Sequence, residues 1–133
     1  MTITPKFRIA LCLTGTIVSP DDITSAIGIV PTATWKVGDP IDSTRLRMKH
    51  DGWKLELPDR DGFELEPVLN EMLNIIDSRF DRVVETIKRH HLQCEIACAI
   101  YLQDAAPSCN LTMDTLNRLC KVGATLDIDI ILC

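Results

Sequence analysis

The sequence predicts an α+β domain in which helices cover one face of a mainly antiparallel sheet of five strands. Two observations lead to this class. Several segments carry apolar residues at every second position, which is the period of a strand with one face buried. The segments between them carry apolar residues three or four positions apart, as amphipathic helices do. The predicted order is β-α-β-β-α-β-α-β, and its first six elements match the split βαβ, or ferredoxin-like, order.

The first strand and the first helix have separate signals. Residues 6–14 alternate between apolar and other residues, which predicts a strand. Its buried side consists of Phe7, Ile9, Leu11 and Leu13. Ser19 then offers a helix N-cap, Pro20 suits the first helical position, and Gly28 offers a stop. A short helix is therefore expected over residues 20–27.

The stretch from Pro31 to Leu57 predicts a β-hairpin. Asp51-Gly52 separates residues 45–50 from residues 53–57, and Asp-Gly favours a type I′ turn because both central positions need φ > 0. In this register His50 lies opposite Trp53 on the inner face. The outer face is then mainly cationic, with Arg45, Arg47, Lys49 and Lys54.

The rest of the chain supplies the remaining elements. Residues 65–91 form the longest helical pattern. The sequence predicts either one helix or two helices separated at Asp77-Ser78, and periodicity does not decide between them. Strands are expected over 94–102 and 125–132, with a helix over 112–121 between them that Gly123 ends. This last helix is predicted to bury Met113, Leu116, Leu119 and Cys120, and the last strand to bury Leu126, Ile128, Ile130 and Leu132.

Composition limits the classes of function. The 133 residues, 46% hydrophobic, suit a single domain over 1–133. The net charge of −5 argues against general nucleic-acid binding. Residues 36–54 carry five basic and three acidic side chains, a local net charge of +2, whereas the remainder carries −7. No apolar run is long enough for a membrane helix.

The expected location is the cytoplasm. Lys6 and Arg8 precede an apolar run as in a signal peptide, but this run alternates like a strand and ends at Thr14-Gly15-Thr16. The six cysteines lack the spacing of zinc ligands, and we expect them to stay reduced, with Cys94 and Cys98 buried as small apolar residues.

Several short motifs carry a resemblance. They are Pro31-Thr32-x-x-Trp35-x-x-Gly38-Asp39-Pro40, Gly52-Trp53, a Leu-rich middle helix and a closing Leu-Asp-Ile-Asp-Ile over 126–130. Over nearly its whole length the chain resembles a bacterial family known only as a domain of unknown function. The resemblance implies no established activity, substrate or catalytic residue. One departure is Asp129-Ile130-Ile131, where relatives often carry an aromatic, and it implies only different local packing.

Two hypotheses of function follow, and both use the stretch 31–57. The first is a cytoplasmic interaction module without catalysis, comparable in class to small acidic bacterial domains that neutralise toxins or act as adaptors. Its binding residues are predicted to be Trp35, Arg45, Arg47, Lys49, His50 and Trp53. The alternative is a small-molecule-binding or hydrolytic domain with a pocket near Trp35, His50 and Trp53.

Other residues offer weaker candidate chemistry. His50, with Asp39, Asp42 and Asp51 nearby in sequence, could act as a general base, but a histidine opposite a tryptophan is more often a packing partner. Asp127 and Asp129 with Glu95 could hold a cation. The simpler interpretation is that they solvate the open face of the sheet, and that they pair with Arg8 if the first and last strands come close. We therefore expect no catalytic residue, no metal and no cofactor.

The expected partner is another protein, without nucleic acid or membrane, and the expected state is a monomer or weak homodimer. Asp127 and Asp129 discourage pairing of two last strands, because like charges brought face to face repel. A dimer is therefore expected to use sheet faces or helices.

Overall fold

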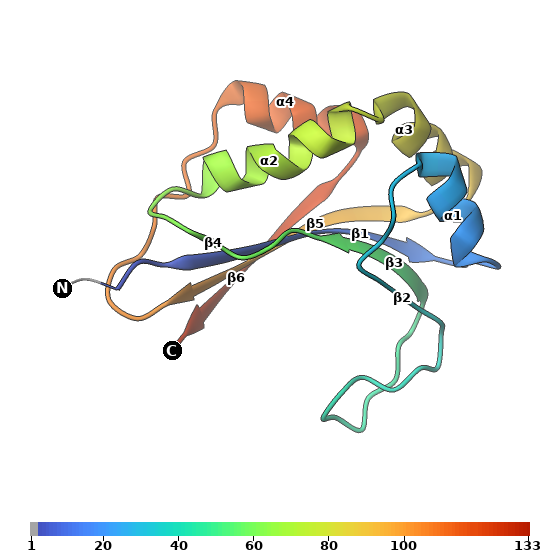
Figure 1. Ribbon diagram of the computed structural model, residues 1–133, viewed down its shortest axis with the longest axis horizontal. Helices are drawn as coiled ribbons and strands as arrows, with labels where there is room; N and C mark the ends of the chain where they lie inside the picture. Colours follow the sequence, from blue (N-terminus) through green and yellow to red (C-terminus); the bar gives the residue numbers. More distant parts are fainter. Residues whose placement is uncertain (1–2) are drawn as a thin grey trace.

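The alternating segments form a single sheet with two different faces in the computed structural model, which describes residues 3–133. All four helices lie on one side of this sheet, and the other side is left open (Figure 1). In chain order the elements are β1 (Lys6–Gly15), α1 (Pro20–Ile27), β2 (Ala33–Trp35), β3 (Asp51–Glu56), β4 (Arg60–Asp61), α2 (Leu65–Asp77), α3 (Phe80–Arg89), β5 (Gln93–Leu102), α4 (Met113–Val122) and β6 (Thr125–Leu132). The α+β class is confirmed.

The strands follow the order β2-β3-β1-β5-β6, and the short β4 also pairs with β1. β3 runs antiparallel to both β1 and β2, so that β1 and β2 are parallel with β3 between them, which is the split βαβ arrangement. β5 is antiparallel to β1 on its other side. The observed order differs from the predicted one by the extra strand β4 and by a parallel pair, β5 with β6, joined through α4.

Local signals place the helix ends as predicted. Pro20 occupies the start of α1, and both Gly28 and Gly123 end helices in the left-handed conformation that glycine adopts without strain. Thr112 caps α4, because its hydroxyl accepts a hydrogen bond from the Thr115 amide. The segment 65–91 forms two helices, with the break at residues 78–79.

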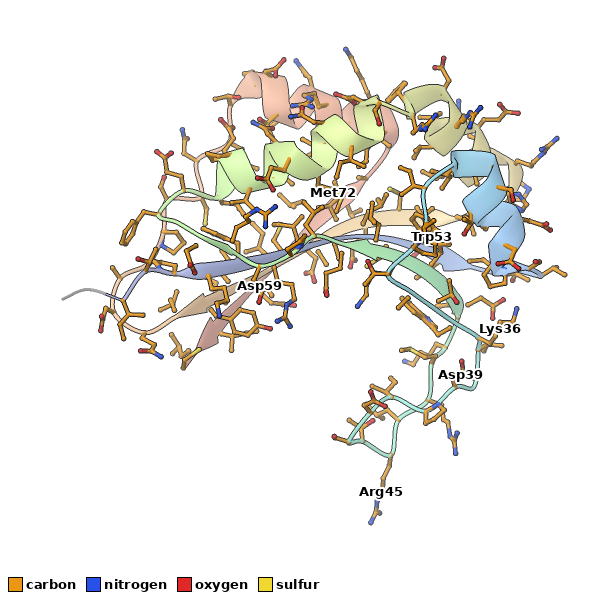
Figure 2. The ribbon with its side chains drawn as sticks, viewed as in Figure 1. Lys36, Asp39, Arg45, Trp53, Asp59 and Met72 are labelled. Carbon is orange, nitrogen blue, oxygen red and sulfur yellow. The ribbon has the colours of Figure 1, made fainter. Side chains whose placement is uncertain are left out.

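The core lies between the helices and one face of the sheet. Phe7, Ile9, Leu11 and Leu13 of β1 are buried there, as are Cys94 and Cys98 of β5, which confirms both alternation patterns. Met72 points from α2 toward the sheet and is fully buried (Figure 2). All six cysteines are unpaired.

Two burial predictions at the end of the chain are wrong. Met113, Leu116 and Cys120 of α4 are exposed, while Thr115, Leu119 and Val122 are buried. In β6, Leu126 is half-buried, but Ile128, Ile130 and Leu132 are 38%, 62% and 78% exposed. The physical reason is position: β6 is the outermost strand, and its second half runs away from the helical layer (Figure 1).

The predicted hairpin turn is also wrong. Asp51 and Gly52 are the first residues of strand β3, and Gly52 does not have a positive φ. His50 is not paired with Trp53; instead Thr34 of β2 lies opposite Trp53, and Trp35 lies opposite Gly52. The Asp-Gly turn signal is overridden because both residues have long-range partners, which are described below.

Candidate functional site: a basic arm and the open face of the sheet

Residues 36–50, called the arm from here on, project from the ends of β2 and β3 on the side of the sheet opposite the helices (Figure 1). The arm is a hairpin in its own right. The Gly38 amide donates to the Met48 carbonyl at 2.8 Å, and the Met48 amide donates to the Asp39 carbonyl at 2.9 Å. Farther out, the Ile41 amide donates to the Leu46 carbonyl at 3.0 Å. These backbone bonds give the arm a defined shape although most of its side chains are exposed.

Asp51 fastens the base of the arm. Its buried carboxylate accepts hydrogen bonds from the Val37 amide at 2.8 Å and the Ile17 amide at 2.7 Å. Lys36 Nζ lies 3.4 Å from the same carboxylate and also donates to the Ile17 carbonyl. The two backbone amides, chiefly that of Val37, hold the pKa of Asp51 below its usual value. One ionised side chain thus joins the arm to the end of β1.

Trp35 and Gly52 form the second contact at the base. The indole of Trp35 lies directly over Gly52, where a Cβ atom would be only 2.0 Å from the ring. Trp35 is half-buried by this contact, so the aromatic covers a strand position that has no side chain of its own. Both residues lie on the open face.

The structure separates the predicted binding residues into three groups. Arg45, Arg47, Lys49 and His50 are exposed on the arm, with Arg45 at its tip (Figure 2). Trp35 lies at the base of the arm. Trp53 is fully buried on the helix side of the sheet, where its indole N–H donates to the Thr24 hydroxyl at 3.1 Å. Trp53 is therefore a core residue, and it does not line an open pocket with Trp35 and His50.

Asp39 and Asp51, the candidate acid partners of His50, are hydrogen-bonded to other groups. Asp39 accepts a hydrogen bond from the Lys36 amide at 2.8 Å, and Asp51 is held by backbone amides. Within residues 3–133, His50 makes no hydrogen bond to a carboxylate. A general base oriented by an acid, the usual arrangement for histidine catalysis, is thus not present in this part of the chain.

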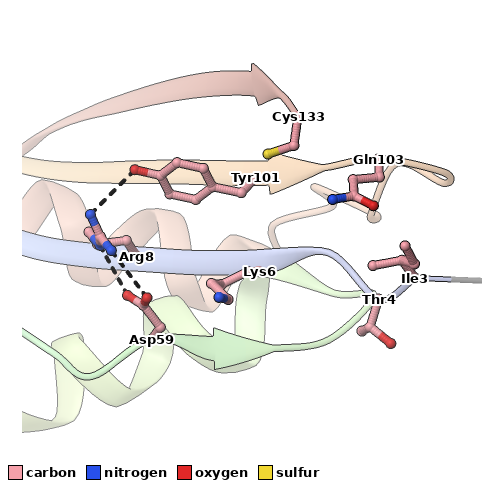
Figure 3. A pocket seen from close by; sticks show the side chains of 8 residues that line it. All are labelled: Ile3, Thr4, Lys6, Arg8, Asp59, Tyr101, Gln103 and Cys133. Carbon is pink, nitrogen blue, oxygen red and sulfur yellow. Dashed lines mark hydrogen bonds and ion pairs between the residues drawn. The ribbon is translucent and has the colours of Figure 1, made fainter.

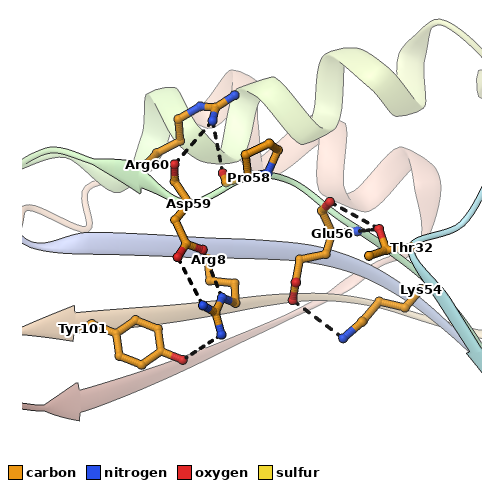
Figure 4. Close-up of polar contacts among 8 residues, drawn as sticks. All are labelled: Arg8, Thr32, Lys54, Glu56, Pro58, Asp59, Arg60 and Tyr101. Atoms are coloured by element: carbon orange, nitrogen blue, oxygen red, sulfur yellow. Dashed lines mark hydrogen bonds and ion pairs between the residues drawn. The ribbon is translucent and has the colours of Figure 1, made fainter.

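The open face has a floor of small side chains surrounded by charges. Strand register places Ala10, Ala97 and Ala99 near its centre. Lys54 and Glu95 flank Cys12 on neighbouring strands, and Lys54 Nζ lies 3.7 Å from Glu56 (Figure 4). On β6 the open-face residues include Asp127 and Asp129. Neither of these two carboxylates has an ion-pair partner among the residues that the structure describes.

At one end of the open face lies a pocket with a volume of about 350 Å³ (Figure 3). Arg8 dominates it, donating to Asp59 through two nitrogens at 3.0 and 3.1 Å and to the Tyr101 hydroxyl at 3.4 Å. This contact raises the pKa of Arg8 and lowers that of Asp59. Thr4, Lys6 and Gln103 add further polar side chains to the lining.

This pocket was not predicted, and the condition for pairing of Arg8 with Asp127 and Asp129 is not met, because β5 lies between β1 and β6. Asp59 takes that place because the turn before β4 returns the chain to β1 (Figure 4). The residues Asp59-Arg60-Asp61-Gly62 are of types common in turns, which does not indicate a side-chain partner.

Other classes of site can be reported briefly. No cluster of three or more histidine, cysteine, aspartate or glutamate side chains suited to a metal ion occurs in residues 3–133. Over the same range, no helix has both the length and the hydrophobicity needed to cross a membrane.

Comparison with known proteins gave one match. A family model described as "Domain of unknown function (DUF4279)" matches residues 5–132. Searches of curated proteins and of solved structures gave no match. The match spans both the arm and the open face.

Proposed function

Because the chain belongs to the family described as a domain of unknown function (DUF4279), membership supplies no activity, and we propose that the chain is a non-catalytic protein-interaction module. Its binding surface is the arm together with the open face. The partner is a protein that presents acidic side chains to the arm.

The observation that carries this proposal is the basic arm on an acidic domain. The arm has Lys36, Arg45, Arg47 and Lys49 against Asp39 and Asp42, a net charge of +2, within a chain of net charge −5. Fields of opposite sign on two proteins accelerate their encounter and fix their relative orientation. The arm also exposes apolar surface, with Val37 60% and Leu46 65% exposed. Projecting side chains that combine positive charge with apolar area suit contact with another protein.

The state and compartment of the module form part of the proposal. Six unpaired cysteines, two of them buried, fit a reducing compartment such as the cytoplasm. Charges of both signs on the open face fit a monomer or a weak homodimer.

The proposal can be tested by capture followed by titration. Wild-type chain, the arm variant Arg45→Glu with Arg47→Glu, and the control Lys88→Glu with Arg89→Glu on α3 are immobilised and exposed to extract of the cells that make the protein. Proteins retained by wild type and control, but not by the arm variant, are identified by mass spectrometry and purified. We expect at least one to bind wild type and to lose about tenfold or more in affinity for the arm variant. Retained proteins that all bind the arm variant equally well, or an empty set, would refute the proposal.

A second candidate function, small-molecule binding, rests on the Arg8 pocket. Lys6, the Tyr101 hydroxyl and Gln103 offer groups for a small anionic ligand, with Arg8 held in place by Asp59. Thermal-shift screening of small carboxylates and phosphates tests this function. A ligand of this pocket should stabilise wild type and lose its effect in Lys6→Ala with Gln103→Ala. A screen without a pocket-dependent shift removes this candidate.

A further inference from the structure

The exposed edge of β6 is complementary to the arm in charge and, like the arm, exposes apolar side chains. β6 is the last strand in the sheet order, so within residues 3–133 the backbone groups on its outer side lack a strand partner. The exposed apolar side chains Ile128, Ile130, Ile131 and Leu132 occur in this one strand. Long apolar edge strands are sites where proteins associate unless something covers them. The β6 edge is therefore a site where another segment of protein can bind and cover the apolar side chains.

The charge on the β6 edge indicates which segment of protein can bind there. Asp127 and Asp129 lie on the open-face side of β6 and have no ion-pair partner among the described residues. The arm carries the complementary set: Arg45, Arg47 and Lys49 are exposed, and Leu46 between them offers apolar surface. Within one molecule the arm leaves from the β2 and β3 side of the sheet, whereas β6 forms the opposite edge (Figure 1). The arm of one molecule therefore needs a second molecule to supply the β6 edge.

Strand order shows that two copies can meet in this way. β1 is the middle strand of β2-β3-β1-β5-β6. The base of the arm lies at the Gly15 end of β1. Asp127 and Asp129 lie level with the other half of β1. If two open faces meet about a two-fold axis that crosses the strands obliquely, the corner of the sheet that carries the arm in each copy lies over the β6 corner of the other. The pairing of the arm with the β6 edge then forms twice.

The length of the arm is sufficient. Facing sheets lie about 10 Å apart, and six extended residues span roughly 20 Å. Each leg of the arm can therefore pass the partner's sheet and lie along its β6 edge. The floor of Ala10, Ala97 and Ala99 leaves room for close approach of the two faces.

We propose that the arm-and-face site binds a second copy of this chain, forming a two-fold dimer in which each arm lies along the β6 edge of the other copy. This proposal rests on the proposed function, because it uses the same arm. Exposed ion pairs provide much of the attraction, so the dimer is weak and dissociates as salt rises.

Charge exchange tests the pairing directly. Mass is measured by light scattering and sedimentation equilibrium across dilution, for wild type and for Arg45→Glu with Arg47→Glu. The second variant is Asp127→Lys with Asp129→Lys, and the third carries all four changes. Lys88→Glu with Arg89→Glu is the control. Circular dichroism checks that each variant is folded.

We expect each reversal alone to raise the dimer dissociation constant at least about tenfold, and the combined variant to return to within about threefold of wild type. The control should behave as wild type does. Three results would each overturn the proposal: a monomeric wild type, a dimer dissociation constant that neither charge reversal changes, or a combined variant whose dissociation constant does not return toward that of wild type.

The Asp127 and Asp129 variant separates this proposal from the proposed function. Its arm is intact, so capture of a different protein by this variant should still depend on Arg45 and Arg47. Loss of self-association with retained arm-dependent capture supports both proposals. Arm-dependent capture by a strictly monomeric wild type overturns the dimer alone, and capture that ignores the arm overturns the proposed function alone.

Discussion

Replacing Gly52 by alanine tests the contact at the base of the arm. The new Cβ would lie 2.0 Å from the Trp35 ring, whereas ordinary contacts begin at 3.4 Å, so the indole must move by 1.4 Å. Overpacking of this kind costs about 1–3 kcal/mol. The strand conformation itself does not oppose alanine, because Gly52 lacks a positive φ. Gly52→Ala should therefore reduce the free energy of unfolding through Trp35 alone.

A double-mutant cycle isolates that cause. In a Trp35→Ala background the collision is absent, and Gly52→Ala should stabilise the chain by about 0.5–1 kcal/mol, since alanine restricts the unfolded chain. The sign of the effect thus reverses between backgrounds, with a coupling free energy of about 1.5 kcal/mol or more. Urea unfolding followed by tryptophan fluorescence measures this, because the buried Trp53 remains as a probe in both backgrounds.

The cycle also discriminates between the strand and the predicted turn. In a type I′ turn Gly52 would have φ > 0, and alanine would be strained whether or not Trp35 is present. An equal loss of stability in both backgrounds would refute the packing explanation and restore the turn. An unchanged stability in wild type would show that Trp35 does not rest on Gly52.

Three further predictions use other parts of the fold. Asp51→Asn should lower the melting temperature at neutral pH, and the difference from wild type should disappear as pH falls below about 4. The reason is that a carboxyl group with a lowered pKa stabilises the fold above the pKa it has in the unfolded chain, and this stability is lost when the group is protonated. A difference in melting temperature that stays constant across that pH range would contradict the anchoring role of Asp51. Under native conditions Ellman's reagent should modify the three exposed cysteines quickly, namely Cys109, Cys120 and Cys133. Cys94 and Cys98 should react slowly, since burial raises the pKa of each thiol to about 12. A disulfide found after denaturation without reductant would contradict the reduced state. Ile100→Ala should lower the free energy of unfolding by about 2–5 kcal/mol, because Ile100 is buried. Ile130, its register partner on β6, is exposed, and Ile130→Ala should lower the free energy of unfolding by less than about 0.5 kcal/mol in dilute solution. Similar values for the two variants in urea unfolding would contradict the edge position of β6.

Local patterns in the sequence were sufficient for much of the fold. β1 and β5 alternate cleanly because one face of each is buried, and their neighbours do not change that period. Pro20, Gly28 and Gly123 act on the backbone within one helical turn, so both ends of α1 and the C-terminal end of α4 could be predicted.

The base of the arm could not be predicted, because its determinants are distant in sequence. Asp-Gly is a strong local turn signal. Here Asp51 instead receives hydrogen bonds from Ile17 and Val37, which lie 34 and 14 positions away, and Gly52 accommodates Trp35. Of the candidate residues, Arg45, Arg47 and Lys49 are exposed as expected. His50 was expected to pack against Trp53 but is exposed, and Trp53 was not recognised as core.

The exposure of β6 was missed for a different reason. Alternation indicates which face of a strand a residue occupies, but not the lateral position of that strand in the sheet. Ile96 and Leu126 are register partners, as are Ile100 and Ile130, and in each pair the β5 residue is buried while the β6 residue is more exposed. Helix coverage decides this difference, and no pattern within β6 records it.

The two segments where local rules fail are also the two segments of the proposed interface. Sequence rules assume that a chain buries its own apolar residues and satisfies its own strand edges. The arm departs from this assumption by exposing Val37 and Leu46 beyond the sheet, and β6 departs from it by exposing Ile130 and Leu132 at the edge. A departure at one place alone would indicate only a local cost in stability. Here the two departures carry opposite charge and lie on opposite edges of the same open face, so each can satisfy the other when two molecules meet.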